Sequence, residues 1–179
     1  MLSKTIAFLD FEASGLSARS WPIEVGWAYP AKTKIKSLDD VVMLPPPKSM
    51  LISPYREWSM EAWDARASEL HRIDLNDLKN NGEHVTKVCA SLNAALGQFD
   101  VYSDAQSWDG FWLMRLFDAG GMRPKFKLND FGLLMKRFIG KRDEEFNKAV
   151  SGFGNRRHRA GPDAAYLRNL FEIARGLQF

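Results

Sequence analysis

Two acidic residues near the start of the chain have the spacing of a cation-binding pair. The apolar, β-branched and aromatic composition of Thr5 to Asp10 predicts a β-strand that leads into Glu12. Residues two apart in a strand point to the same face, so Asp10 and Glu12 are expected to project together while Phe11 faces the core. Two like charges at the end of an apolar strand are electrostatically costly unless a cation lies between them. For this segment alone, a turn that leaves both carboxylates in solvent is the alternative.

Two later segments contribute two more acids and a histidine. Asp109 falls at the predicted start of a helix, and His158 precedes Asp163 by five residues where a loop enters another helix. Each feature alone has an ordinary explanation, because aspartate side chains cap helices and interact favourably with the dipole at a helix N-terminus. Capping is therefore the alternative to a metal-binding role for Asp109.

Taken together, the three segments resemble the three ordered motifs of the DEDDh exonuclease family, also called DnaQ-like. The first family motif is usually Asp-x-Glu-Thr-Thr-Gly-Leu, and residues 10–16 here read Asp-Phe-Glu-Ala-Ser-Gly-Leu. Asp109 matches the acid of the second motif, and His158 with Asp163 matches the His-x4-Asp of the third. The resemblance runs from Ile6 to about Phe171, which is nearly the whole chain.

Secondary matches and departures accompany these motifs. Residues 22–26 match the family's Ile-Glu-x-Gly, and residues 71–73 match its His-Gly-Ile with Arg72 in place of glycine. Ala13 replaces a threonine of the first motif. Asp104 stands where the family commonly has the asparagine of His-Asn-Ala, which adds an acid near the site. We expect Asp104 to be a solvated turn residue, and a ligand role is the alternative. His71 is expected to be structural, and His84 to be a surface or capping residue.

The resemblance implies a metal-dependent 3′→5′ exonuclease that releases 5′-mononucleotides from DNA or RNA by two-metal hydrolysis. Two divalent ions about 3.5–4 Å apart stabilise both ends of an in-line displacement at phosphorus. Mg²⁺ or Mn²⁺ suits such oxygen ligands. By resemblance, Asp10 bridges both ions, Glu12 and Asp163 complete one site, and Asp109 acts mainly through coordinated water. His158 is the general base that takes a proton from the attacking water.

The resemblance also indicates how a substrate binds, with single-stranded nucleic acid or a 3′ end as the partner. Backbone N–H groups at Ala13 and Ser14 would contact the terminal nucleotide, and Leu16 would wedge against its base. Trp108 could stack on a base, with core packing as the alternative. Several small relatives form dimers, so a homodimer stays open beside a monomer.

Two other classes of function compete with this interpretation. A domain of the same fold that binds nucleic acid without catalysis would explain Asp104 and the altered first motif, although all five catalytic residue types are present. A structural interaction protein whose acids only cap helices would leave the pair of Asp10 and Glu12 without a counterion.

The elements that position these residues alternate in type along the chain. Strands are predicted at Thr5–Asp10, Ile23–Tyr29, Ile35–Leu44, Phe99–Ser103 and Phe126–Asn129. Helices are predicted at Met60–Leu70, Val85–Leu96, Asp109–Ala119, Phe131–Ile139, Asp143–Val150 and Pro162–Arg175. This order predicts an α/β domain with a mixed five-stranded sheet flanked by helices, and it suits a ribonuclease-H-like fold.

Composition sets the remaining expectations. The 179 residues, 45% of them hydrophobic and 26% charged, fit one domain over residues 1–179, without a membrane span. The start of the chain lacks a signal-peptide pattern, so a cytoplasmic protein is expected. The one cysteine, Cys89, is predicted in the core. A net charge of +3 is weak evidence for a polyanionic partner. Two basic clusters, at residues 123–142 and around His158, could track a phosphate backbone.

Overall fold

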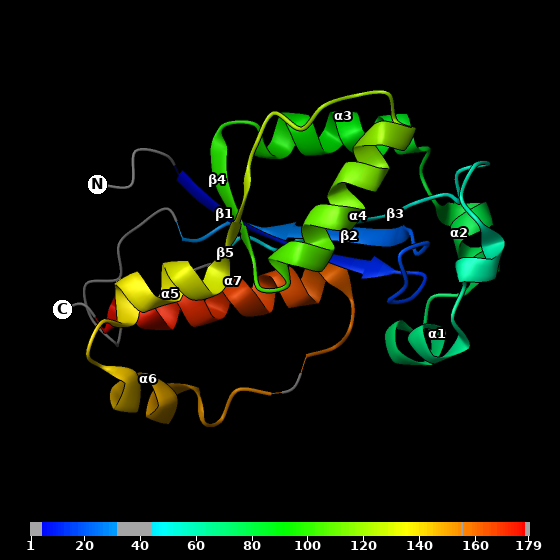
Figure 1. Cartoon of the computed structure of the whole chain (residues 1–179). Helices are drawn as coiled ribbons and strands as arrows, with labels where there is room; N and C mark the ends of the chain where they lie inside the picture. Colours follow the sequence, from blue (N-terminus) through cyan, green and yellow to red (C-terminus); the bar gives the residue numbers. More distant parts are fainter. Residues whose placement is uncertain (1–4, 32–43, 155, 178–179) are drawn as a thin grey trace.

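The strands form one mixed sheet in the order β3-β2-β1-β4-β5 (Figure 1). A computed structural model describes residues 5–31, 44–154 and 156–177. β1 pairs antiparallel with β2 and parallel with β4, while β2–β3 is antiparallel and β4–β5 is parallel. The strands are β1 (Thr5–Ala13), β2 (Pro22–Ala28), β3 (Lys48–Leu51), β4 (Phe99–Ser103) and β5 (Leu128–Asp130). The predicted α/β fold with a mixed five-stranded sheet is confirmed.

Helices cover both faces of this sheet, as Figure 1 shows. α3 (Val85–Leu96) and α4 (Gln106–Ala119) lie on one face, and α5 (Phe131–Ile139) and α7 (Ala160–Gly176) lie on the other. α6 (Asp143–Val150) packs outside α7. Near the β2–β3 end are a 3₁₀ turn, η1 (Met60–Ala62), and the short helices α1 (Ala65–His71) and α2 (Leu75–Asn81).

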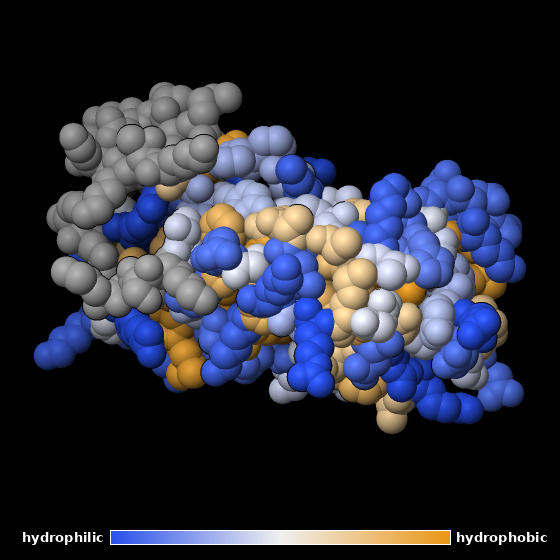
Figure 2. All heavy atoms as spheres, turned by 90° about the horizontal axis from the view of Figure 1, so that it is seen from above, coloured by the Kyte–Doolittle hydropathy of each residue, from blue (hydrophilic) through white to orange (hydrophobic). Residues whose placement is uncertain are grey.

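The alternation of side chains along β1 divides the core into two layers. Leu9 and Phe11 belong to the larger cluster, which α3 and α4 complete, whereas Phe8 packs with Leu167 and Phe171 of α7. The even-numbered residues of β1 therefore face α5 and α7. Cys89 is fully buried in the larger cluster, as predicted. Viewed from the α3 side, hydrophilic side chains surround a central band of more apolar ones (Figure 2).

Several predicted boundaries were wrong for identifiable reasons. The single helix predicted at 60–70 is split, because Asp64 is extended and caps α1 by accepting a hydrogen bond from the Arg66 N–H at 2.9 Å. The sequence interpretation missed α2, which Asp74 caps in the same manner. α7 begins at Ala160, ahead of Pro162, whose missing N–H falls among the first four that no helix bonds internally.

The strand and helix ends near the site also shift. β1 continues to Ala13, so Glu12 lies in the strand and not in a turn. α4 begins at Gln106 instead of Asp109, and β5 begins at Leu128. The strand predicted at residues 35–44 falls almost wholly outside the described residues, and the third strand of the sheet is β3, after the prolines. Across the described residues, no helix is both long and apolar enough to cross a membrane.

Candidate metal centre

The end of β1 and the start of α7 bring three carboxylates together. Asp10 and Glu12 share the face of β1 that α7 covers, and Asp163 lies in the first turn of α7. One carboxylate oxygen from each of the three lies within 4.8 Å of the others. Asp10 and Asp163 are buried, and Glu12 is half-buried.

A second group shares Asp10 with the first. Oxygens of Asp10, Asp104 and Asp109 also lie within 4.8 Å of one another. Asp109 is only 1% exposed, in the first turn of α4, and its Oδ2 has no well-formed hydrogen bond to any residue that the structure describes. The N-cap of α4 is Ala105, so the capping alternative for Asp109 is excluded. Asp104 is an exposed residue of the turn between β4 and α4.

The pKa values of three of these carboxylates are raised, because the positive charge nearby does not offset their burial and mutual repulsion. Burial, reinforced by Asp109 and Glu12, raises the pKa of Asp10 well above its usual value. Burial together with Asp163 and Glu24 raises the pKa of Glu12 to about 8. Burial also raises the pKa of Asp109 to about 7, and Asp104 adds to the effect. Each shift reflects the cost of ionising an acid among other acids in a poorly solvated place.

These residues fit hard divalent cations. All the donors are carboxylate oxygens, which Mg²⁺ and Mn²⁺ prefer. Ser103 and the Phe11 backbone interact with the Asp109 carboxylate and lower its pKa, but its buried Oδ2 lacks a well-formed hydrogen bond among the described residues. Such a buried acceptor is suited to a ligand or ion. Because Asp10 belongs to both groups, its carboxylate would contribute to a cation site formed by either one.

A glycine and a buried glutamate set the position of α7 against the sheet. A Cβ on Gly26 of β2 would lie 2.1 Å from the backbone carbon of Ala160, so only glycine permits this approach. Glu24 accepts two hydrogen bonds from the Arg159 guanidinium, both at 2.9 Å, and one from the Ala160 N–H at 3.0 Å. The Ile-Glu-x-Gly segment was the only signal in the sequence for this anchor, and the role of Arg159 was missed.

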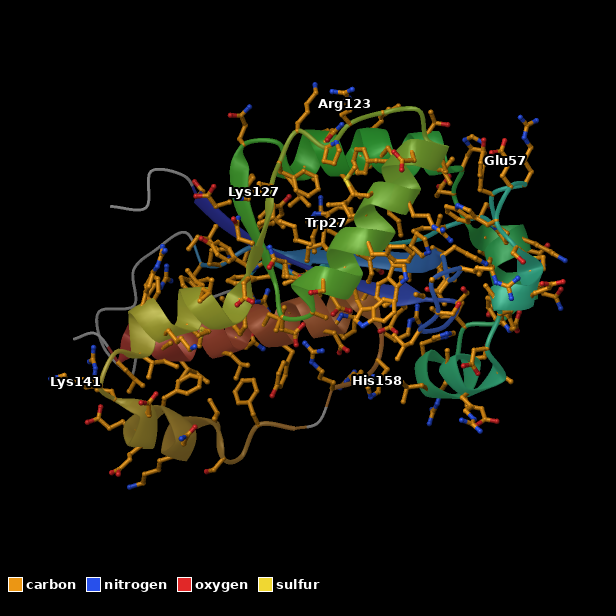
Figure 3. All side chains as sticks on the ribbon, in the orientation of Figure 1. Trp27, Glu57, Arg123, Lys127, Lys141 and His158 are labelled. Atoms are coloured by element: carbon orange, nitrogen blue, oxygen red, sulfur yellow. The ribbon has the colours of Figure 1, made fainter. Side chains whose placement is uncertain are left out.

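His158 lies on the loop that enters α7, on the side of α1 (Figure 3). Its backbone is in the left-handed region, with φ 52°. The preceding Arg157 donates its N–H to Oδ1 of Asp163 at 3.1 Å, and the following Arg159 is held by Glu24. The two neighbours of His158 are thus each fixed to an acid of the sheet or of α7.

The residues predicted to contact substrate fall into two sets. Ala13 and Ser14 are buried, and the Ser14 hydroxyl accepts a hydrogen bond from the Trp21 N–H at 3.0 Å, which closes the turn after β1. Leu16 is 71% exposed on that turn, and Trp108 is 38% exposed. Trp108 stacks on Trp112 with ring centroids 5.5 Å apart, leaving its outer face in solvent.

The two remaining histidines are structural. His71 is buried, its Nδ1 accepts a hydrogen bond from the Ile73 N–H at 3.1 Å, and burial lowers its pKa to about 4. His84 caps α3 by accepting from the Thr86 N–H. Arg72, in the position where the resembling motif has glycine, has a left-handed backbone with φ 55°.

Arg156 lies beside the carboxylates of the metal centre, whereas the sequence indicated it only as part of a basic cluster. Its Nη2 lies 2.5 Å from Oδ2 of Asp104, so the acid that departs from the motif is ion-paired. The guanidinium lowers the pKa of Asp10, Glu12 and Asp109, although burial outweighs it in each. No spacing rule would have placed an arginine here, because the loop that carries it has no regular periodicity.

Comparisons with known proteins place the fold. No protein-family model and no curated protein sequence matches this chain. Among solved structures, the chain is similar to E. coli exonuclease I with single-stranded DNA and zinc (TM-score 0.72, 12% identity, 98% of this chain and 41% of that one). It is also similar to E. coli exonuclease I with a dT13 oligonucleotide (0.69, 12%, 96% and 41%).

An exonuclease I from Methylocaldum szegediense gives a TM-score of 0.69 at 12% identity, over 98% of this chain and 41% of that one. The chain thus spans about two fifths of the length of these proteins. At this identity the likeness establishes the fold: an α/β domain of the exonuclease I type, with a buried cluster of carboxylates at the end of its central strand.

Proposed function

We propose that this chain is a metal-dependent 3′→5′ exonuclease of the DEDDh type. The observation that carries the proposal is the convergence of Asp10, Glu12, Asp109 and Asp163 from three distant segments of the chain. The exonuclease I fold supports it, since those structures hold single-stranded oligonucleotides. The proposal treats residues 1–179 as one exonuclease domain.

In this mechanism the four carboxylates would hold two metal ions. Asp10 is shared, Glu12 and Asp163 serve one ion, and Asp109 serves the other. Two Mg²⁺ or Mn²⁺ ions, when bound, supply an activated water and stabilise negative charge on the phosphoryl oxygens. His158 takes the proton of the attacking water, and the contacts of Arg157 and Arg159 hold the backbone that carries it.

The substrate we propose is single-stranded nucleic acid or an unpaired 3′ end, of DNA or RNA. Exposed Leu16 and the outer face of Trp108 are available to bases, and stacking on an aromatic ring is worth about 1–3 kcal/mol per base. Ala13 and Ser14 would contribute through their backbone, because the Ser14 hydroxyl is engaged with Trp21.

A second candidate, a domain of this fold that binds nucleic acid without hydrolysing it, has one observation in its favour. The guanidinium of Arg156 beside Asp104 places a fixed cation at the carboxylate cluster. If that cation replaced the metal, the protein would bind nucleic acid without requiring or responding to Mn²⁺.

The test is incubation of 5′-labelled single-stranded DNA and RNA with the protein and Mg²⁺ or Mn²⁺. We expect stepwise shortening from the 3′ end, release of 5′-mononucleotides, and a block by a 3′-phosphate. Asp10→Asn should abolish turnover and also the thermal stabilisation by Mn²⁺, because this carboxylate serves both groups. Internal fragments as first products, or degradation from the 5′ end, would refute the assignment.

A further inference from the structure

Arg156 has an unusual setting for a surface-loop arginine. Its side chain is 29% exposed, and its guanidinium carbon lies 5.7 Å from the centre of the Tyr166 ring on α7. Asp104 is its ion-pair partner. The aromatic ring and the carboxylate thus restrict the guanidinium from two sides, which lowers the entropy cost of using it to bind a ligand.

The arginine has donors to spare. Its buried Nη2 is paired with Asp104 at 2.5 Å, and within the described part of the chain that nitrogen has no second acceptor. A guanidinium carries five N–H donors in a rigid fork that matches carboxylate and phosphate oxygens. One ion pair therefore leaves most of this fork uncommitted.

The guanidinium of Arg156 interacts electrostatically with carboxylates of the metal centre. Asp10 and Asp163 both raise the pKa of Arg156, as does Asp104, although burial opposes them. Arg159, by contrast, is committed to Glu24 through two hydrogen bonds. Arg156 is thus a cation at the carboxylates whose hydrogen-bonding capacity is not used by the fold.

We propose that Arg156 binds the phosphate that occupies the metal centre, and that Asp104 is the residue that positions it. This inference rests on the proposed function. Once metal ions neutralise the four carboxylates, the phosphate and Asp104 are the anions left beside the guanidinium, whose five N–H donors can bind both. The ion pair also cancels the charge of Asp104, so the acid that departs from the family motif does not repel the substrate.

The experiment measures binding of thymidine 5′-monophosphate, a reaction product that cannot be turned over, at saturating Mn²⁺ by titration calorimetry. Arg156→Gln should weaken this binding about 10- to 100-fold, the range for losing a charge-assisted hydrogen bond to phosphate. Arg56→Gln, the same change at an arginine whose side chain is 83% exposed and takes no part in the carboxylate cluster, is the matched control and should change binding less than twofold.

Mn²⁺ binding without nucleotide is the second readout. Arg156→Gln should bind Mn²⁺ as tightly as the wild type or a few-fold more tightly, because a competing cation is removed. Asp104→Asn should weaken nucleotide binding a few-fold, and should have no further effect when combined with Arg156→Gln. If Asp104→Asn instead weakens Mn²⁺ binding tenfold whether or not Arg156 is present, Asp104 is a ligand and the positioning role is wrong.

The outcomes separate this inference from the proposed function. Unchanged nucleotide affinity in Arg156→Gln, while the wild type degrades 3′ ends, overturns the inference and leaves the exonuclease standing. A wild-type protein that binds neither Mn²⁺ nor the nucleotide overturns both.

Discussion

At the scale of single residues, folding makes the carboxylates of the metal centre harder to ionise. Burial and neighbouring acids raise the pKa of Glu12 from 4.5 to about 8 and that of Asp109 from 3.8 to about 7. An acid whose pKa is raised by folding stabilises the fold while it is protonated in both states. That contribution is lost as pH rises from the unfolded pKa through the folded one.

We predict that the metal-free protein loses stability between pH 6.5 and 8. His71 has the opposite dependence, since its pKa falls from 6.5 to about 4, but its effect fades above pH 6.5 as the imidazole loses its proton in the unfolded state too. Urea unfolding at several pH values in the presence of a chelator should therefore show a falling free energy of unfolding over this interval. Saturating Mn²⁺ should flatten the trend, because bound metal keeps the carboxylates ionised.

Glu12→Gln tests the source of this pH dependence. It should raise the stability of the metal-free protein at pH 8 and remove much of the slope, while Glu57→Gln, at an exposed surface position, serves as the control. A metal-free protein whose stability rises from pH 6.5 to 8 would show that the carboxylates are already compensated.

At the scale of elements, the sequence predicted the placement of the acidic residues better than the boundaries of the elements around them. Strand alternation placed Asp10 and Glu12 on one face, because a period of two depends only on local geometry. The break between η1 and α1 was missed because Asp64 acts through a single side-chain cap. The paths of Arg156 and Arg159 were not predictable, since each is fixed by a partner more than 50 residues away, Asp104 and Glu24.

Gly26→Ala should displace the start of α7. The added Cβ would meet backbone atoms of Ala160 and Gly161 at 2.1–2.3 Å, which no side-chain rotation relieves. We expect a loss of about 1–3 kcal/mol in the free energy of unfolding, the usual cost of overpacking, together with weaker Mn²⁺ binding as Asp163 shifts. Gly110→Ala, in open space on α4, is the control and should be neutral or stabilising by up to about 1 kcal/mol. Equal effects of the two substitutions would contradict this account of the β2–α7 contact.

Arg72→Gly should stabilise the protein. Arg72 ends α1 in the left-handed region (φ 55°, ψ 35°), and its N–H donates to the Ser68 carbonyl at 2.8 Å. Glycine adopts this conformation without the cost of about 1–2 kcal/mol that other residues bear, although its freer unfolded chain offsets part of the gain. Thermal unfolding should show a net gain of about 0.5–1 kcal/mol. Arg72→Ala, which keeps the strain, should show no gain.

At the scale of the whole molecule, many basic side chains come from one segment of the chain that contributes none of the clustered acids. The acids converge at one end of β1, while seven cations lie between the end of α4 and the start of α6. They are Arg123, Lys125, Lys127, Lys136, Arg137, Lys141 and Arg142, and no ion pair with a described acid neutralises any of them. In Figure 3, Arg123 lies beside α3, Lys127 on the segment that leads into β5, and Lys141 just past the end of α5.

Lys127 and Arg137 line a pocket of about 240 Å³ at the β5 edge of the sheet. Gln106, the first residue of the helix that carries Asp109, lines it as well. β5 is the edge strand next to β4, and β4 ends at the turn that holds Asp104. A strand of nucleic acid with its 3′ end at the carboxylates would therefore find positive charge along this edge.

We predict that replacing both Lys127 and Arg137 with glutamine weakens the binding of single-stranded DNA and reduces its dependence on salt. For single strands the logarithm of affinity falls with the logarithm of salt concentration by about 0.7 per phosphate contact, so two lost contacts should lower the slope by about 1.4. Fluorescence anisotropy at several NaCl concentrations, with the Asp10→Asn variant to prevent degradation, gives the slope directly. Lys79→Gln with Lys148→Gln makes the same change in net charge on exposed faces of α2 and α6, so it separates a local contact from the overall charge of the protein. Equal slopes for the two double variants would mean that the strand leaves the metal centre in another direction, since a phosphate held by Lys127 or Arg137 must release counterions when it binds.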